Sequence, residues 1–256
     1  MANGESVIRY SQRDDSREDK FKQVWHEELN DVFADVARYY DRANYVASLG
    51  LWGLFRKSFI SMIDVKSGQQ VLDVCAGTNA IGIALLQKQP DLHVTAVDRS
   101  DAMQEMGSKQ AQKRGLHIDS VIHDVHELPF PDNSFDVVTL QFASRHLRIY
   151  DVTREIMRVL KPGGHFYHSD MLRPASKLVG NLYYTYLRGC LSFTAVIFRS
   201  GKAALNCREY FIDALQAFYS ADEFDQLLSE VGFKAVTHKT LFGGMLGFHK
   251  AMKPSD

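Results

Sequence analysis

Cysteine is scarce in this chain of 256 residues, and the three present, Cys75, Cys190 and Cys207, lie far apart in the sequence. They form no C-x-x-C pair and no spacing typical of a secreted disulfide framework. The N-terminal sequence MANGESVIRYSQRDD is also too polar for a signal peptide. We therefore expect a protein of a reducing compartment, the cytoplasm.

A surplus of charge of either sign is absent as well. The formal net charge is −1 and the pI is about 6.8, so nucleic acid is not an expected partner. Repeats and low-complexity blocks are also missing. Because 45% of the residues are hydrophobic, the chain is suited to one well-packed domain with at most a smaller cap.

Glycine-rich phosphate-binding loops are the third absence. The turn after the first predicted strand reads CAGTNA at residues 75–80, with one glycine where a dinucleotide fingerprint needs three. A Walker-type G-K-[ST] does not occur either. These absences exclude the usual binding motifs for dinucleotides and nucleoside triphosphates.

The strongest positive signal is VLDVCAGTNAIG at residues 71–82. It predicts a buried strand, a tight turn of small residues and the start of a helix. Asp73 interrupts the apolar strand near its end, and Asn79 can adopt a positive φ or cap the helix. In an open α/β sheet, ligands bind beyond the carboxyl ends of the strands, so this turn should lie against a small molecule.

A second predicted strand covers residues 93–97, and Asp98 follows at its tip. An acidic residue one strand–helix–strand unit after the first turn can accept both hydroxyls of an adenosine ribose. Adenosine without phosphates points to S-adenosylmethionine. The alternative is an ordinary α/β turn followed by a surface aspartate.

The order of segments predicts an α/β fold. Residues 1–20 are charged and poor in apolar residues, and we expect them to be mobile. Residues 21–66 read as helices, and strands and helices alternate over residues 67–170, which favours a doubly wound parallel sheet. Residues 171–220 read as a helical, apolar insert, and residues 221–256 as a final helix and a closing β-hairpin.

The insert over residues 171–220 is rich in leucine and tyrosine. Asn181, Arg188 and Gly189 interrupt it, so a membrane-spanning helix is not expected. One interpretation is a helical cap with its own core contacts. The other is a wall for an apolar substrate, or a patch that touches a membrane surface.

Several blocks together resemble a known family. VLDVCAGT, VTAVDRSDAM, HELPFPDNSFDVVT, REIMRVLKPGGHF and GGMLGFHK occur in the order found in class I S-adenosylmethionine-dependent methyltransferases. With YYDRANYVASLGLWGLFRKSFI upstream, the chain is most similar to the ubiquinone/menaquinone biosynthesis C-methyltransferases of the UbiE/MenG type. The resemblance covers about residues 38–252.

The resemblance implies a mostly parallel seven-stranded sheet, an antiparallel closing hairpin and an N-terminal helical lid. Gly77 and Thr78 would face the methionine part of the cofactor, and Asp98 its ribose. The cofactor-binding residues expected are Asp73, Ala76, Gly77, Thr78, Asn79, Asp98, Arg99, Asp124, Val125 and Gln141. The residues expected at the lid and the substrate are Tyr40, Asn44, Tyr183 and Tyr210.

Four positions depart from the family pattern. Ala76 and Asn79 stand where glycine is usual, Gln141 where serine is usual, and His146 where asparagine is usual. The stretch NCREY at residues 206–210 also lacks a Tyr-Arg pair expected near Tyr210. These changes indicate a divergent member and leave the acceptor open.

Methyl transfer needs mainly the positioning of two reactants. A phenolic ring carbon becomes nucleophilic when its hydroxyl ionises, which calls for a base or a cation beside the phenolate. Arg145 and His146 follow the fourth predicted strand, where substrate should meet cofactor. We predict His146 as the base and Arg145 as the oxyanion partner. Alternatively, His146 caps a helix near Tyr150 and Arg145 pairs with an acid.

A metal site is not expected from the histidines. His165 and His168 are three apart on a predicted strand and face opposite ways, and no H-E-x-x-H pattern occurs. His123 and His126 flank the predicted adenine loop.

Three functions remain open. The first is C-methylation of a quinol or another prenylated phenol. The second is O-, N- or C-methylation of another small metabolite, and the third is a non-catalytic binding or assembly protein of methyltransferase fold. Peripheral membrane contact and a homodimer are compatible with each.

Overall fold

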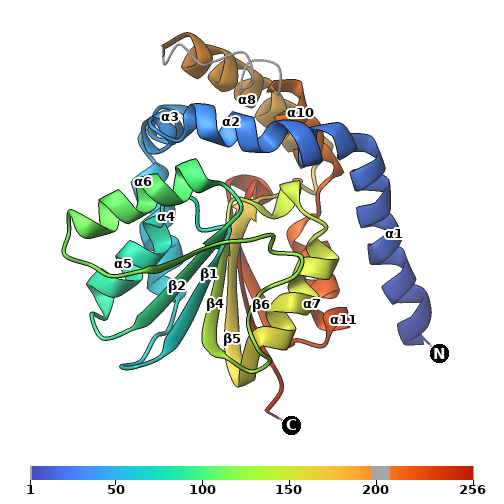
Figure 1. Cartoon of the computed structure of the whole chain (residues 1–256). Helices are drawn as coiled ribbons and strands as arrows, with labels where there is room; N and C mark the ends of the chain where they lie inside the picture. Colours follow the sequence, from blue (N-terminus) through green and yellow to red (C-terminus); the bar gives the residue numbers. More distant parts are fainter. Residues whose placement is uncertain (1, 198–207, 256) are drawn as a thin grey trace.

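The computed structural model describes residues 2–197 and 208–255. Seven strands form one sheet in the order β3-β2-β1-β4-β5-β7-β6 (Figure 1), which confirms the predicted doubly wound α/β fold. The strands are β1 (Gln70–Val74), β2 (His93–Asp98), β3 (Asp119–Ile122), β4 (Phe135–Gln141), β5 (Leu160–Met171), β6 (Lys234–Leu241) and β7 (Leu246–Met252).

Strands β1 to β5 are parallel, and β7 lies antiparallel between β5 and β6. The predicted closing hairpin is therefore confirmed. In β1, Val71, Leu72 and Val74 are fully buried because helices cover both faces of the sheet. The parallel register brings the carboxyl ends of β1, β2 and β4 to one edge of the sheet.

Helices cover both faces of the sheet. On one face, α5 (Ala80–Lys88) packs on β2, α6 (Asp101–Gln112) packs on β2 and β3, and α4 (Trp52–Met62) packs beside α5 with Phe59 against Phe248 of β7. On the other face, α7 (Ile149–Val159) and α11 (Ala221–Val231) cover β5 to β7. These layers leave the carboxyl ends of the parallel strands free for other elements.

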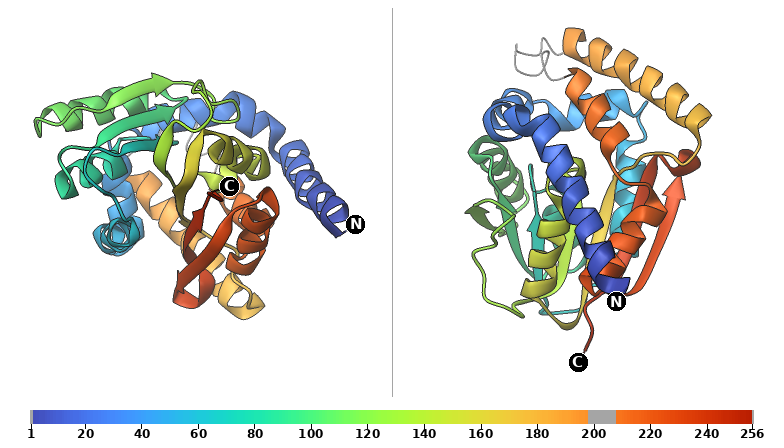
Figure 2. Two further views of the ribbon diagram at one scale, coloured as in Figure 1. Left: turned by 90° about the horizontal axis from the view of Figure 1, so that it is seen from below. Right: turned by 90° about the vertical axis from the view of Figure 1, so that its right-hand side faces the viewer.

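Those ends are covered by helices from two distant parts of the chain. They are η1 (Val24–Glu28), α2 (Leu29–Val36), α3 (Tyr40–Ala47), α8 (Lys177–Ile197) and α10 (Arg208–Ala217). Figures 1 and 2 show α8 above α2 and α3 at this end of the molecule. Within the described ranges, no helix is both long and apolar enough to cross a membrane.

Residues 2–20, which the composition led us to expect as mobile, are helical in the structure. They form most of α1 (Ala2–Gln23), which packs along α7 and α11. Asp14 and Arg17 are buried and paired at 2.8 Å. Asp14 also accepts a hydrogen bond from the backbone N–H of Tyr150, and Arg17 donates to the carbonyl oxygens of Arg145 and Leu147. The charges of this segment therefore have partners inside the protein, which composition alone did not reveal.

Candidate active site

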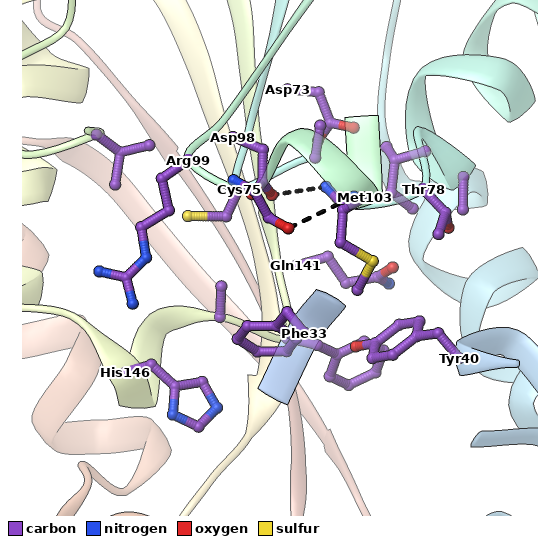
Figure 3. Close-up of a pocket in the computed structure, with 18 of the residues that line it drawn as sticks. Phe33, Tyr40, Asp73, Cys75, Thr78, Asp98, Arg99, Met103, Gln141 and His146 are labelled. Atoms are coloured by element: carbon purple, nitrogen blue, oxygen red, sulfur yellow. Dashed lines mark hydrogen bonds between the residues drawn. The ribbon is translucent and has the colours of Figure 1, made fainter. Parts of the chain in front are cut away.

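The turn between β1 and α5 is built around Asp98. One oxygen of its carboxylate accepts the backbone N–H of Gly77 at 2.8 Å, and the other accepts that of Ser100 at 2.9 Å (Figure 3). Burial raises the pKa of Asp98, and the two N–H donors oppose that rise. The carboxylate of Asp98 therefore holds the turn in place while it lines the pocket beyond the strands.

The pocket rim contains strained backbone. Cys75 and Phe142, which both line the pocket, have φ values of 53° and 57° without being glycine. Such conformations cost about 1–3 kcal/mol each and cluster at ligand-binding sites. Phe142 is held by its stack on Trp52 of α4, with ring centroids 4.7 Å apart.

Asn79 does not lie in the pocket, which corrects its predicted role in cofactor binding. Its φ is 56°, as predicted for a residue that tolerates the left-handed region. Its side chain is fully buried behind the turn, against Gly107 of α6. There Gln104 donates to Oδ1 of Asn79 at 2.9 Å and to the carbonyl oxygen of Gly77 at 3.0 Å. The departure from glycine thus supports the turn and leaves the pocket clear.

Eight other predicted cofactor residues and Asp98 line one pocket at the carboxyl ends of the strands. They are Asp73, Ala76, Gly77, Thr78, Arg99, Asp124, Val125 and Gln141. Figure 3 shows Phe33 of α2 and Tyr40 of α3 opposite the turn that holds Cys75 and Thr78. The N-terminal helices therefore form one wall of the pocket, where a lid was expected.

Three buried polar atoms of this pocket have no partner in the described chain: Oδ2 of Asp73, Nε2 of Gln141 and Nε2 of His146. The other oxygen of Asp73 accepts from Thr139 at 2.7 Å. An acceptor and an amide donor left over in one pocket fit the ammonium and carboxylate groups of a methionine moiety. Burial raises the pKa of Asp73 to about 7, so a bound cation there would favour its ionised form.

The opposite end of the pocket is formed by the loop after β3. Oδ1 of Asp124 contacts the ring of His126 at 2.6 Å, and this hydrogen bond holds the pKa of Asp124 well below its usual range.

Arg99, which follows β2, donates to the carbonyl oxygen of Trp25 in η1 at 2.8 Å. The strand ends are therefore tied directly to the N-terminal helices.

His146 lines the pocket, but its hydrogen bonds argue against the predicted role as a base. The indole Nε1–H of Trp25 donates to the hydroxyl of Tyr210 at 2.8 Å, and this hydroxyl lies 2.5 Å from Nδ1 of His146. If Tyr210 donates to Nδ1, the proton of the neutral His146 ring lies on Nε2, which is buried and has no partner among the described residues. Burial also holds the pKa of His146 well below its usual value. The imidazole is thus a neutral donor.

Arg145 lies outside this pocket. Its guanidinium pairs with Asp170 at 2.5 Å, as the alternative interpretation of the sequence proposed, and Asp170 is fully buried. Arg145 lines a second cavity between α2, α3, α8 and α10, together with Asn44 and Tyr40. The residues lining this cavity are otherwise mostly apolar.

The residues predicted to contact the substrate do not all line the same cavity. Tyr183 lines neither cavity and packs with Tyr184, Ile212 and Leu215. Tyr210 also lines neither cavity, and its hydroxyl contacts Nδ1 of His146. Asn206 and Cys207 lie outside the described residues.

Several residues that shape the two cavities were not predicted from the sequence. Asp170 lies near the carboxyl end of a buried strand, as Asp98 does, and that position was a usable signal. Gln104 and Arg17 lie in polar helical sequence, where nothing in the pattern indicated a buried role. Trp25 showed only its apolar periodicity, because the partner of its N–H is 185 residues away.

Residues 21–253 match the ubiE/COQ5 methyltransferase family. The chain belongs to this family. It is 34% identical over 231 residues to a demethylmenaquinone methyltransferase of Paenarthrobacter aurescens, covering 90% of this chain and 88% of that protein. It is 31% identical over 231 residues to a ubiquinone/menaquinone biosynthesis C-methyltransferase of Azotobacter vinelandii, covering 88% of this chain and 89% of that protein.

Solved structures agree on the fold. A SAM-dependent methyltransferase from Aquifex aeolicus has a TM-score of 0.55 at 19% identity over 77% of this chain and 89% of that one. A phosphoethanolamine N-methyltransferase of Haemonchus contortus bound to S-adenosyl-L-methionine has a TM-score of 0.61 at 15% identity, over 80% of this chain and 53% of that one. This member of the ubiE/COQ5 family is a class I methyltransferase whose cofactor is S-adenosylmethionine.

Proposed function

We propose that this protein methylates a ring carbon of a lipophilic hydroquinone. The observation that carries the proposal is the pair of adjoining cavities. Phe33 and Tyr40 line both the polar cofactor pocket and the second cavity. An acceptor in the second cavity would therefore meet the cofactor where these two side chains lie, and a movement of the lid would bring the two together.

The second cavity suits an aromatic ring. The volume of this cavity is about 190 Å³. Apolar cavities of about 150 Å³ in other proteins are large enough to bind benzene. Its apolar lining comes mainly from four helices and includes Val32, Val36, Leu187, Leu191 and Leu215. A charged or strongly polar metabolite would lose hydration there without compensation, which disfavours the other acceptor classes.

Arg145 is the charged residue among the described residues that line this cavity. The cofactor supplies an activated methyl group when bound. Arg145 would stabilise the phenolate that makes the neighbouring ring carbon nucleophilic, and Asp170 would hold the guanidinium in position. His146 would contribute an Nε2–H donor at the cofactor side of the wall.

Exposed leucines gather on α8 and around the segment that joins α3 to α4, and we propose that this apolar face rests on a membrane surface. Leu178 and Leu182 of α8 are 71% and 66% exposed, Leu49 is 76% exposed and Leu54 is 54% exposed. These elements adjoin, since the hydroxyl of Tyr186 donates to the carbonyl oxygen of Ala47 at 2.6 Å. Helix α8 has two basic residues and no acidic residue, which suits anionic lipid.

A cavity-filling variant tests the acceptor site. Ala43→Phe fills the second cavity without touching the cofactor pocket, and Ala34→Phe adds the same ring at an exposed position of α2. We expect Ala43→Phe to raise KM for a prenylated hydroquinone by about tenfold, or 1.4 kcal/mol, with the Kd for S-adenosylmethionine unchanged. Equal kinetics for both variants would contradict the proposal.

Co-sedimentation with vesicles of mixed neutral and anionic phospholipid tests the membrane face. Leu178→Ser/Leu182→Ser should lose vesicle binding, whereas exposed Leu241→Ser should retain it. A homodimer that covers the same face would instead appear as a concentration-dependent mass that the double variant abolishes.

A further inference from the structure

Three histidines lie side by side across β5, β7 and β6. His168 pairs with His249, and His249 pairs with His238, in the strand register. Cross-strand partners point to the same face, here the face that α11 covers (Figure 1). Asp225 of α11 lies above the outer pair, with Oδ2 2.5 Å from Nδ1 of His238 and Oδ1 3.8 Å from Nε2 of His249.

Two atoms of this cluster are buried without a hydrogen-bond partner: Nε2 of His249 and Oδ1 of Asp225. His249 is 1% exposed, and its Nε2 is aimed at the carboxylate. A separation of 3.8 Å is too long for a hydrogen bond between them. The ring of His249 also approaches the backbone of Ala221. A plain ion pair between Asp225 and His238 would not account for the two atoms left over.

The ligand atoms of Asp225, His238 and His249 lie within 4.8 Å of one another. Around a tetrahedral zinc ion with bonds of about 2.0–2.1 Å, ligand atoms are about 3.3 Å apart. Small side-chain rotations would therefore suffice: His238 moves away from Asp225, and His249 approaches it. Asp225 and His238 are each about a quarter exposed, so an ion can enter from solvent.

His249 also has an outer hydrogen-bond partner of the kind that orients a metal-bound histidine, and a carboxylate lies near the outer nitrogen of His238. If His238 binds through Nδ1, its Nε2 faces the carboxylate of Asp222 at 3.8 Å. If His249 binds through Nε2, its Nδ1 lies 3.1 Å from Nδ1 of His168. Such partners fix the tautomer and the orientation of a ligating imidazole.

We propose that Asp225, His238 and His249 form a binding site for a divalent transition metal of the zinc class, separate from the methyl-transfer site. Two imidazoles and one carboxylate, with water or Asp222 in the fourth position, are ligands of the kind zinc takes. The site joins α11 to the β6–β7 hairpin and would stabilise the packing between them.

The site would also orient a buried chain of hydrogen bonds. A metal on Nε2 of His249 leaves its proton on Nδ1, which then donates to Nδ1 of His168. Nε2 of His168 must then carry the proton and donate to the hydroxyl of Ser144, 2.7 Å away. The backbone N–H of Ser144 donates to Asp170, the partner of Arg145. Metal binding would therefore fix a tautomer next to the residues that hold Arg145.

The test is a titration of the full-length protein, stripped with a chelator, with Zn²⁺ and with Co²⁺. We expect one equivalent per chain, a visible cobalt spectrum of a four-coordinate site, and Nδ1–H tautomers at His249 in long-range ¹H–¹⁵N spectra. His238→Gln, at a partly exposed position, should weaken binding at least about 100-fold. His117→Ala removes a surface histidine paired with Asp119 and should leave binding unchanged.

Two outcomes would overturn the proposal. One is wild-type affinity for Zn²⁺ no greater than that of His238→Gln. The other is a cobalt spectrum that His117→Ala abolishes and His238→Gln does not. Asp225→Asn provides an independent check, because it keeps the shape of the side chain and should weaken binding as His238→Gln does.

Discussion

The hydroxyl of Tyr210 lies 2.5 Å from Nδ1 of His146 and accepts the indole N–H of Trp25 on its other side. Three separate parts of the chain meet at this point: η1 of the N-terminal region, α10 of the insert, and the segment after β4. The state of His146 in the cofactor pocket therefore depends on both helical regions that cover the strand ends.

Replacing Tyr210 by Phe should lower kcat by about tenfold, because the tautomer of His146 is then no longer fixed. The free energy of unfolding should fall by about 1–3 kcal/mol, since two buried groups lose their partner. Trp25→Phe leaves the contact between Tyr210 and His146 in place and should lower kcat less. Steady-state kinetics measures kcat for each variant, and urea unfolding measures the free energy of unfolding. Equal losses of kcat in the two variants would contradict the tautomer assignment.

Asp98→Asn should weaken the binding of S-adenosylmethionine at least about tenfold. Both carboxylate oxygens accept backbone N–H groups, and the amide NH₂ of asparagine would face one of these donors. Isothermal titration measures the Kd. Asp101→Asn, on the exposed first turn of α6, serves as the matched control. Unchanged affinity in Asp98→Asn would refute the assignment of this pocket to the cofactor.

Arg145→Ala should destabilise the protein by about 3–5 kcal/mol, because the fully buried Asp170 loses its countercharge. Adding Asp170→Asn should restore most of the stability without restoring methyl transfer. Thermal unfolding and a methylation assay together separate the two effects. If the double variant turned over at the wild-type rate, Arg145 would have no role at the acceptor.

Asp73 makes stability depend on pH. Its pKa is raised by burial from 3.8 to about 7 in the folded protein. Between these values the folded chain holds a proton that the unfolded chain has released, so the stability present below pH 3.8 is lost as the pH rises towards 7. The slope is at most about 1.4 kcal/mol per pH unit.

Asp73→Asn removes this titration and keeps an oxygen for Thr139. Relative to the wild type, it should gain about 1–3 kcal/mol in free energy of unfolding between pH 5 and pH 8, measured by urea unfolding. At pH 8 the Asp73→Asn variant should bind S-adenosylmethionine more weakly than the wild type, because asparagine offers the ammonium group a neutral acceptor in place of a carboxylate. A stability difference that stays constant over this range would show that Asp73 does not titrate there.

The cofactor half of the site followed from the sequence because its residues are local. The turn at 75–80 and Asp98 lie at the ends of strands, and parallel strands place their ends together, whereas the loop at 124–125 was implied by the family resemblance. The α/β alternation predicted the sheet for the same reason. Even the left-handed backbone of Asn79 was readable from its residue type.

What could not be predicted depends on register and on contacts between distant segments. His168, His238 and His249 lie on three strands, and only the pairing of those strands shows that they are neighbours. Arg17 and Asp14 look like solvated charges until α1 packs on α7. The direction of Asn79 and the partner of His146 likewise depend on Gln104 and Tyr210, which belong to other elements.

The most direct test of the proposed function is methyl transfer with S-adenosylmethionine labelled with ¹³C in the methyl group. The acceptor is a prenylated hydroquinone that has an unsubstituted ring carbon beside a hydroxyl. Its unprenylated analogue serves as the comparison. We predict a new ¹³C signal of a methyl group bonded to ring carbon, formed faster on the prenylated acceptor and lost in Arg145→Ala/Asp170→Asn. A methoxy signal, or no product in protein that binds the cofactor, would contradict the proposed C-methylation.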